Sequence, residues 1–208
     1  MGFGAGGVPP VVRRLGNREV RFRGKVDRVE RTADGSVVVV DYKTGSPRRF
    51  AGLSSDCVDR GRHLQLPVYA LAAAAAGLGP EKDGSSDRRA SVSACYRFVG
   101  DERAEVRFEL TDQGLARLDE TLGILVRTGL AGTFAFRPGM RDRGDFENCR
   151  SCDFSRVCPA DRDRYWSVAR STAALAPYVF LVEGAEAGEA ADPAEDTTVA
   201  DQDPTAGA

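Results

Sequence analysis

The sequence lacks the features that would place it in a membrane or outside the cell. No run of about 18 or more apolar residues occurs, so no segment is long enough to span a bilayer as a helix. The first residues, Met1–Gly7, have neither the positive flank nor the apolar stretch of a secretory signal. We therefore expect a cytoplasmic protein with no membrane partner. In that reducing setting its five cysteines would bind a metal or a cluster rather than form disulfides.

Positive charge is absent from the C-terminal end of the chain. From Ser171 to Ala208 there is no Lys or Arg, whereas this stretch carries eight acids: Glu183, Glu186, Glu189, Asp192, Glu195, Asp196, Asp201 and Asp203. The rest of the chain keeps 29 basic residues against 23 acidic ones, a net charge of about +6. A basic body suits a polyanionic partner such as nucleic acid, although the excess is modest.

Composition divides the chain, which has the length of one ordinary domain, into four parts. Residues 1–10 are rich in Gly and Pro and are expected to be flexible. Residues 11–145 carry mixed strand and helix patterns and are expected to form an α/β core. Residues 146–170 hold three cysteines and a short helix. Residues 183–208 have too few apolar side chains to fold and are expected to be a disordered acidic tail.

The periodicity of apolar residues predicts the elements of the core. Alternation of apolar and charged residues predicts a strand over 19–31, followed by a turn at Gly35. The β-branched run Val37–Val40 is typical of a buried central strand. Further elements are expected as a helix over 63–77, strands over 91–99 and 102–110, a helix over 111–129 that Thr111 caps, and a short helix over 160–170.

The first hairpin brings acidic and basic side chains together. Asp27 and Asp41 are equally far from Asp34 at the centre of the turn, so they would lie opposite each other, roughly 5 Å apart at Cβ. Lys43 follows Asp41 by two residues and would share its face of the strand. Paired carboxylates attract a hard cation such as Mg²⁺ or Mn²⁺, which lowers the pKa of a bound water. The alternative is a surface hairpin with ordinary charges.

These residues resemble a known family. Val26-Asp27 followed by Asp41-Tyr42-Lys43-Thr44-Gly45 resembles the active-site signature of the PD-(D/E)XK nucleases, with Val26 at the position usually written as Pro. The likeness is closest to the branch found in helicase–nucleases such as RecB and AddB, and it covers roughly residues 11–170. It implies a restriction-endonuclease-like mixed sheet flanked by helices, with a cysteine-rich C-terminal staple. It also implies Mg²⁺- or Mn²⁺-dependent DNA cleavage.

The resemblance assigns roles to the hairpin. Asp27 and Asp41 would bind the metal, together with the carbonyl of Tyr42, and Lys43 would be the catalytic base or an electrostatic stabiliser. Gln65 and Tyr69, one helical turn apart, match a family motif that contacts DNA or supports the lysine. Without the preceding hairpin, this pair favours an amphipathic helix with Tyr69 in the core and Gln65 at its edge.

Two further groups near the hairpin have plainer interpretations. His63, the only histidine, is interpreted as a polar residue at the start of a helix rather than a catalytic group. Four arginines flank the predicted site and either contact DNA phosphates or belong to a solvated loop: Arg48, Arg49, Arg60 and Arg62.

Three cysteines form a compact motif, Cys149-x2-Cys152-x5-Cys158-Pro159. Thiolates at this spacing suit Zn²⁺ or an iron–sulfur cluster. The resemblance favours a [4Fe–4S] cluster over zinc, because the RecB-like branch often carries one with this arrangement. The fourth ligand is not identified, since Cys95 is expected in the core and Cys57 in a loop after the catalytic strand.

The segment before Asp27 departs from the family pattern. It is too short for the family's first helix and its upstream cysteine, so we expect this chain to be the C-terminal piece of a longer protein. The main functional hypothesis is an exonuclease domain that acts with a helicase in DNA recombination and repair. Two alternatives remain, a stand-alone nuclease of the CRISPR-adaptation kind and a non-catalytic DNA-binding or scaffold module of a helicase complex.

Overall fold

The computed structural model describes residues 1–4, 8–79, 90–150 and 152–184. The expected acidic tail lies outside these ranges from residue 185 onward. Within them, no helix has both the length and the apolar character needed to cross a bilayer. The strands are β1 (Gly2–Phe3), β2 (Val11–Leu15), β3 (Arg18–Phe22), β4 (Gly24–Lys25), β5 (Arg28–Arg31), β6 (Val37–Lys43), β7 (Val92–Phe98), β8 (Asp101–Glu109), β9 (Arg141–Asp142) and β10 (Asp145–Phe146). The helices are η1 (Pro47–Ser54), η2 (Asp59–Gly61), α1 (Gln65–Ala75), α2 (Asp112–Leu130), α3 (Arg162–Arg170), η3 (Ala173–Leu175) and α4 (Ala176–Glu183).

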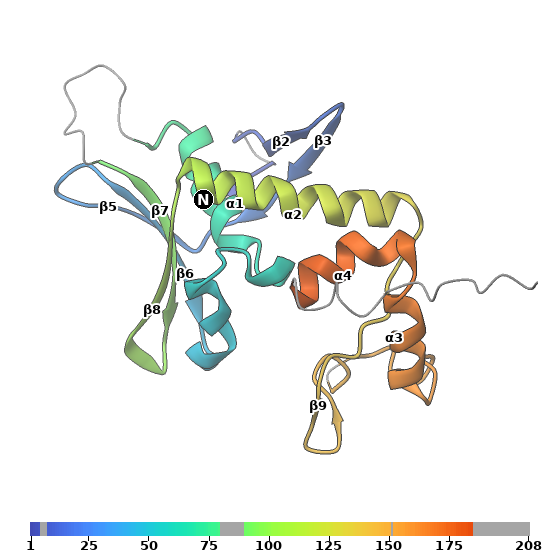
Figure 1. The fold of residues 1–208 in the computed structure, drawn as a ribbon. Helices are drawn as coiled ribbons and strands as arrows, with labels where there is room; N and C mark the ends of the chain where they lie inside the picture. The colour runs from blue at the N-terminus through green and yellow to red at the C-terminus, as the bar shows by residue number, and fades with distance from the viewer. Residues whose placement is uncertain (5–7, 80–89, 151, 185–208) are drawn as a thin grey trace, which may run out of the picture.

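A mixed sheet in the order β5-β6-β7-β8 forms the centre of the protein. β6 runs parallel to β7, while the β5–β6 and β7–β8 pairs are antiparallel. α1 connects the two parallel strands and packs against the sheet, with α2 beyond it and α4 against α2 (Figure 1). This arrangement confirms the predicted α/β fold, a mixed sheet flanked by helices.

β6 is buried on both faces, as the run of four valines predicted. Val37 and Val39 belong to the main core, which α1 covers, whereas Val38 and Val40 form a small cluster with Cys95 on the opposite face. Because side chains alternate along a strand, Asp41 and Lys43 continue the face of Val37 and Val39. The strand therefore carries its two charged residues toward the start of α1.

α1 begins close enough to Pro67 to tolerate it. The helix starts at Gln65, so the missing amide of Pro67 falls among the first residues, whose amides have no partner within the helix. The Ala-rich run that follows packs closely on the sheet, and Gly77 adopts a φ of +71° just after the helix. The sequence predicted a helix over 63–77, which matches α1 to within two residues.

The N-terminal residues are more ordered than their composition predicted. β1 pairs antiparallel with β4, and Phe3 is only 2% exposed. Its ring meets Tyr69 edge-on at 6.2 Å between centroids. A flexible segment over residues 1–10 was expected, but in residues 1–4 the burial of one large aromatic ring outweighs the entropy lost on ordering. Residues 5–7 of that segment lie outside the described ranges.

The predicted strand over 19–31 is interrupted. It divides into β3, β4 and β5, with breaks at Arg23 and at Val26-Asp27. Val26 remains fully buried and its amide donates to the carbonyl of Met1 at 2.8 Å. The second break matters for function because it releases Asp27 from the sheet.

The segment after Arg170 folds further than the sequence analysis predicted. η3 and α4 follow α3, and Leu181 and Val182 pack against Ile124 of α2. Glu183, where the disordered tail was expected to begin, is the last residue of α4. Its carboxylate pairs with Arg170 and accepts a hydrogen bond from the Trp166 indole. A short apolar run that packs on an existing helix therefore suffices to extend the fold.

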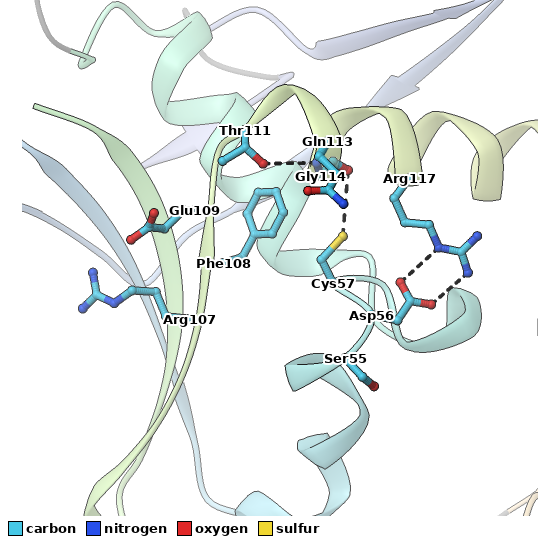
Figure 2. Close-up of a pocket in the computed structure, with 10 residues that line it drawn as sticks. All are labelled: Ser55, Asp56, Cys57, Arg107, Phe108, Glu109, Thr111, Gln113, Gly114 and Arg117. Carbon is cyan, nitrogen blue, oxygen red and sulfur yellow. Dashed lines mark hydrogen bonds and ion pairs between the residues drawn. The ribbon is translucent and has the colours of Figure 1, made fainter. Parts of the chain in front are cut away.

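The loop between η1 and η2 is fixed to α2 through Asp56. Arg117 donates two hydrogen bonds to the Asp56 carboxylate, at 3.1 and 2.8 Å (Figure 2). The backbone amides of Val58 and Arg60 donate to the same carboxylate. Burial alone would raise the pKa of Asp56, but these hydrogen bonds outweigh burial and lower it. The charged carboxylate thus holds together the segment that leads into α1.

Candidate active site

Asp41 and Lys43 form the centre of the site at the C-terminal end of β6. The Lys43 ammonium lies 2.6 Å from Asp41 Oδ2, and Asp41 is only 6% exposed. A buried carboxylate next to a partly exposed amine is unusual at the end of an otherwise apolar strand. The two groups lie on one face of β6, as their spacing predicted.

Gln65, the first residue of α1, links the members of the site. Its Oε1 accepts a hydrogen bond from Lys43 Nζ at 2.9 Å. Its Nε2 donates to Asp41 Oδ1 at 2.9 Å and to the Tyr69 hydroxyl at 2.7 Å. One amide therefore fixes the orientation of a carboxylate, an ammonium and a phenol at once.

Tyr69 supports the site from the next turn of α1. Its hydroxyl donates to the Lys25 carbonyl at 2.9 Å. Burial raises the pKa of this phenol, and the nearby charges of Asp41 and Asp27 raise it further. Tyr69 is accordingly a neutral donor at physiological pH. The ring of Tyr69 is also part of the hydrophobic core. Tyr69 therefore both packs in the core and, through its hydroxyl, contacts Gln65 of the site.

Asp27 lies across the hairpin from Asp41. The β5–β6 register pairs Arg28 with Val40, and Asp27 and Asp41 are the next positions along it. This register agrees with a turn centred on Asp34. Asp27 Oδ2 accepts a hydrogen bond from the Tyr42 amide at 3.0 Å, so the carboxylate lies against the backbone between Asp41 and Lys43.

Tyr96 is a neighbour of the site that the sequence analysis missed. It pairs with Asp41 across the parallel strands, and the Lys43 ammonium lies 4.6 Å from the centre of its ring. Phe50 from η1 contacts Tyr96, with 4.8 Å between ring centroids. Only the parallel register of β6 and β7 brings Tyr96 here, and no local motif signals that register.

A basic cleft of about 940 Å³ opens beside Lys43. One wall is the loop after β6 and η1, and the other comes from residues 147–150 in the C-terminal segment. The charged residues that line it are Lys43, Arg48, Arg49, Arg62, Glu147 and Arg150, and the His63 imidazole lines it as well. Arg48 and Arg49 form no ion pair within the described residues, which leaves their charges available for an anionic ligand.

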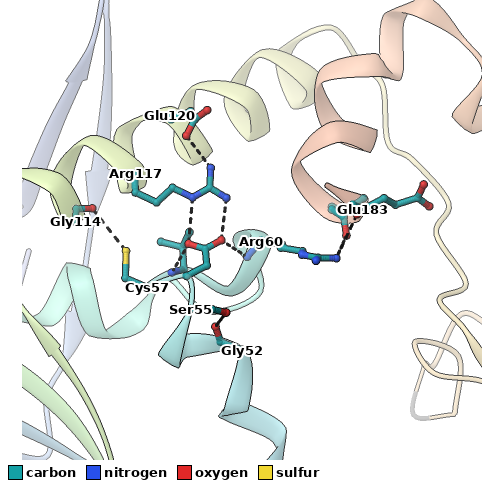
Figure 3. Close-up of polar contacts among 11 residues, drawn as sticks. Gly52, Ser55, Cys57, Arg60, Gly114, Arg117, Glu120 and Glu183 are labelled. Atoms are coloured by element: carbon teal, nitrogen blue, oxygen red, sulfur yellow. Dashed lines mark hydrogen bonds and ion pairs between the residues drawn. The ribbon is translucent and has the colours of Figure 1, made fainter. Parts of the chain in front are cut away.

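His63 and Arg60 differ from the other candidates around the cleft. The His63 ring packs on Phe50 at 4.8 Å, and its Nε2 lies 3.6 Å from Asp59, just before α1 begins. This position agrees with its interpretation as a polar residue near the helix start. Arg60 turns away and donates to the carbonyls of Val182 and Glu183 at the end of α4 (Figure 3).

The oxygen atoms at the centre of the site suit a hard divalent cation. Asp41 Oδ2 is buried, and its close partner among the described residues is the Lys43 ammonium. Asp27 adds a second carboxylate, which accepts a hydrogen bond from the Tyr42 amide. No three His, Cys, Asp or Glu side chains gather as a ligand set in the described ranges. Two carboxylates with a backbone carbonyl and waters would be sufficient for Mg²⁺ or Mn²⁺.

The cysteines do not gather into a comparable set. Cys149 is buried, whereas Cys152 and Cys158 are partly exposed, and the three thiols form no ligand cluster in the described part of the chain. Cys95 lies in the sheet, as expected. The Cys57 thiol points to the Gly114 carbonyl at 3.8 Å, beside a cavity of about 550 Å³ under α2 (Figure 2). Neither supplies a fourth ligand.

Comparison with known proteins agrees with this geometry. The family model of the PD-(D/E)XK nuclease superfamily matches residues 1–159, which include the sheet, α1, α2 and the cleft. A search of the curated proteins finds no match. Because the family model covers most of the chain, and the fold has the mixed sheet flanked by helices that this family requires, the protein belongs to the PD-(D/E)XK nuclease superfamily.

Proposed function

We propose that this protein hydrolyses phosphodiester bonds of DNA with the help of Mg²⁺ or Mn²⁺. One observation carries the proposal: Gln65 joins Asp41 and Lys43 in a single network at the mouth of a basic cleft. A core ion pair would be covered by apolar neighbours. Here Lys43, paired with the buried Asp41, lines a groove in which arginines outnumber acids, as a phosphate-binding site requires.

In this proposal Asp27 and Asp41 hold the metal, together with the Tyr42 carbonyl. The bound ion would supply an acidified water and neutralise charge on the scissile phosphate. Lys43 orients or deprotonates the attacking water, or stabilises the charge of the transition state. Gln65 and Tyr69 are positioning residues, because they contact Asp41 and Lys43 and keep them in place.

The exonuclease assignment and the helicase partner are the finer part of the proposal. They are supported by the likeness of Asp41-Tyr42-Lys43-Thr44-Gly45 to the RecB-like branch. We expect the purified protein with Mn²⁺ to degrade linear DNA from its ends and to leave a covalently closed circle of the same sequence intact. Gel analysis of both substrates, with EDTA as the control, measures this.

Each outcome of that experiment selects one hypothesis. Cleavage of the circle would replace the exonuclease with an endonuclease. Binding of DNA without cleavage of either substrate would favour the non-catalytic module. An active protein that copurifies with no helicase when isolated from its native cells would favour the stand-alone nuclease.

We also propose, from the spacing of Cys149, Cys152 and Cys158, that the C-terminal segment binds a [4Fe–4S] cluster in the reducing cytoplasm. A ligand from elsewhere would complete the set. Protein purified without oxygen is then expected to absorb at about 400 nm and to contain iron and sulfide in equal amounts. The assignment would be refuted if the protein contained zinc in place of iron, or if Cys152→Ser kept the full absorbance of wild type.

A further inference from the structure

A second basic cavity lies next to the active-site cleft. It has a volume of about 340 Å³, and its lining includes Arg60, Arg62, Arg137, Asn148 and Tyr178. Arg62 and Asn148 also line the active-site cleft, so the two spaces adjoin. No acidic side chain is among the described residues that line the second cavity, although three arginines are.

Two of these arginines are held close together. Arg60 and Arg137 each donate to the carbonyl of Val182, both at 3.4 Å. Neither has a carboxylate partner within the described residues. Glu183 directly follows Val182 in the chain, but its carboxylate pairs with Arg170 and accepts a hydrogen bond from Trp166 instead. Two like charges therefore share one neutral acceptor, and an anion between them would relieve their repulsion.

A plainer explanation accounts for only part of this arrangement. Cations near the end of a helix interact favourably with its last carbonyls, and Arg60 reaches two of them at the end of α4. Arg137, however, has its Nε buried with no hydrogen-bond partner in the described structure. A buried donor without an acceptor is costly, and a helix end does not require it. The helix end therefore leaves the charge of Arg137 without a counter-ion among the described residues, and an oxyanion in the cavity would supply one.

We propose that this cavity binds a backbone phosphate of the same DNA strand that occupies the active-site cleft. The inference rests on the proposed function, because it needs a strand in the cleft. Arg62 and Asn148 belong to both spaces, so a strand could pass from one to the other along them. The ligand is a phosphodiester, and Arg137 is its main contact, with Arg60 beside it.

The test compares wild-type protein with Arg137→Ala by fluorescence anisotropy of a single-stranded oligonucleotide in EDTA. We expect Arg137→Ala to bind about tenfold more weakly, because one charged hydrogen-bonding group is lost. The slope of log K against log salt should decrease by about 0.7, the value for one phosphate of a single strand. In cleavage assays KM should rise while kcat stays the same, since Arg137 does not contact the reacting atoms.

The control is Arg21→Ala, which removes the same charge from an exposed side chain on β3. Arg137→Lys keeps the charge and should recover part of the affinity. Thermal melting shows whether each variant is folded. If Arg137→Ala does not fold, Arg60→Ala replaces it, because Arg60 lines the second cavity and does not line the active-site cleft.

Equal affinity and equal salt slope for Arg137→Ala and Arg21→Ala would overturn the inference and leave the proposed function standing. A wild type that binds no DNA would overturn both. Inorganic phosphate distinguishes a small-anion site from a strand contact. If phosphate raised the melting temperature of wild type but not of Arg137→Ala, while both bound DNA equally, the cavity would not serve the strand.

Discussion

Replacing Lys43 with Ala is expected to reduce the rate of DNA cleavage by roughly 10³-fold, the usual loss when one acid–base or electrostatic group is removed. The Lys43 ammonium lies 2.6 Å from Asp41 and is held there by Gln65. In the proposed mechanism, its removal would deprive the attacking water of its orienting group and the scissile phosphate of a neighbouring positive charge. Initial rates on a labelled linear duplex with Mn²⁺ measure the effect.

Metal binding separates the role of Lys43 from that of Asp41. Lys43→Ala leaves Asp41 without its neighbouring cation, so Mn²⁺ should still raise the melting temperature, by at least as much as in wild type. Asp41→Asn should lose both the cleavage and the Mn²⁺-dependent shift. Arg21→Ala serves again as the control for an exposed charge. Full cleavage by Lys43→Ala would disprove the catalytic assignment, and an unchanged Mn²⁺ shift in Asp41→Asn would disprove the metal site.

Replacing Asp56 with Ala is expected to lower the free energy of unfolding at pH 7 by about 3 kcal/mol. The change removes both hydrogen bonds from Arg117 and leaves the amides of Val58 and Arg60 without their acceptor. Arg117 would then be a partly buried, unpaired charge. Urea unfolding followed by circular dichroism measures the difference.

Glu120→Ala is the matched control for this prediction. Glu120 pairs with the same Arg117 but is 54% exposed, so its removal should change the free energy of unfolding by less than about 1 kcal/mol (Figure 3). If both variants lost the same free energy of unfolding, the hydrogen bonds of Asp56 would stabilise the fold no more than an exposed ion pair does.

The stabilisation from Asp56 should depend on pH in a defined direction. The pKa of Asp56 is lower in the folded protein than in the unfolded chain. A group of this kind stabilises the fold fully above its unfolded pKa, which is about 3.9 for Asp. The contribution is lost as the pH falls through the folded pKa. The difference between wild type and Asp56→Ala should therefore narrow below about pH 4.

The central hairpin was predictable because its signals are local. Gly35 marks the turn, the valine run marks the buried strand, and alternation alone places Asp41 and Lys43 on one face. The observed β5–β6 register agrees with a turn centred on Asp34. α1 was predictable for the same reason, since an Ala-rich run ends at a glycine.

The surroundings of the site were not predictable in this way. Tyr96 reaches Lys43 through the pairing of parallel strands, and Glu147 and Arg150 reach the cleft through the path of the C-terminal segment. Neither arrangement has a periodicity or a motif in the sequence. The N-terminal strand was missed because one buried ring, Phe3, determines its position, whereas the prediction relied on average composition.

The cleft has walls from two distant parts of the chain, which has a consequence during synthesis. The Asp41–Lys43 strand and η1 leave the ribosome well before residues 147–150, which complete the opposite wall. A nascent chain that has been made only through β8 therefore contains the proposed catalytic residues but lacks the second wall of the groove. The order of synthesis alone would therefore delay tight binding of DNA until the C-terminal segment has been made.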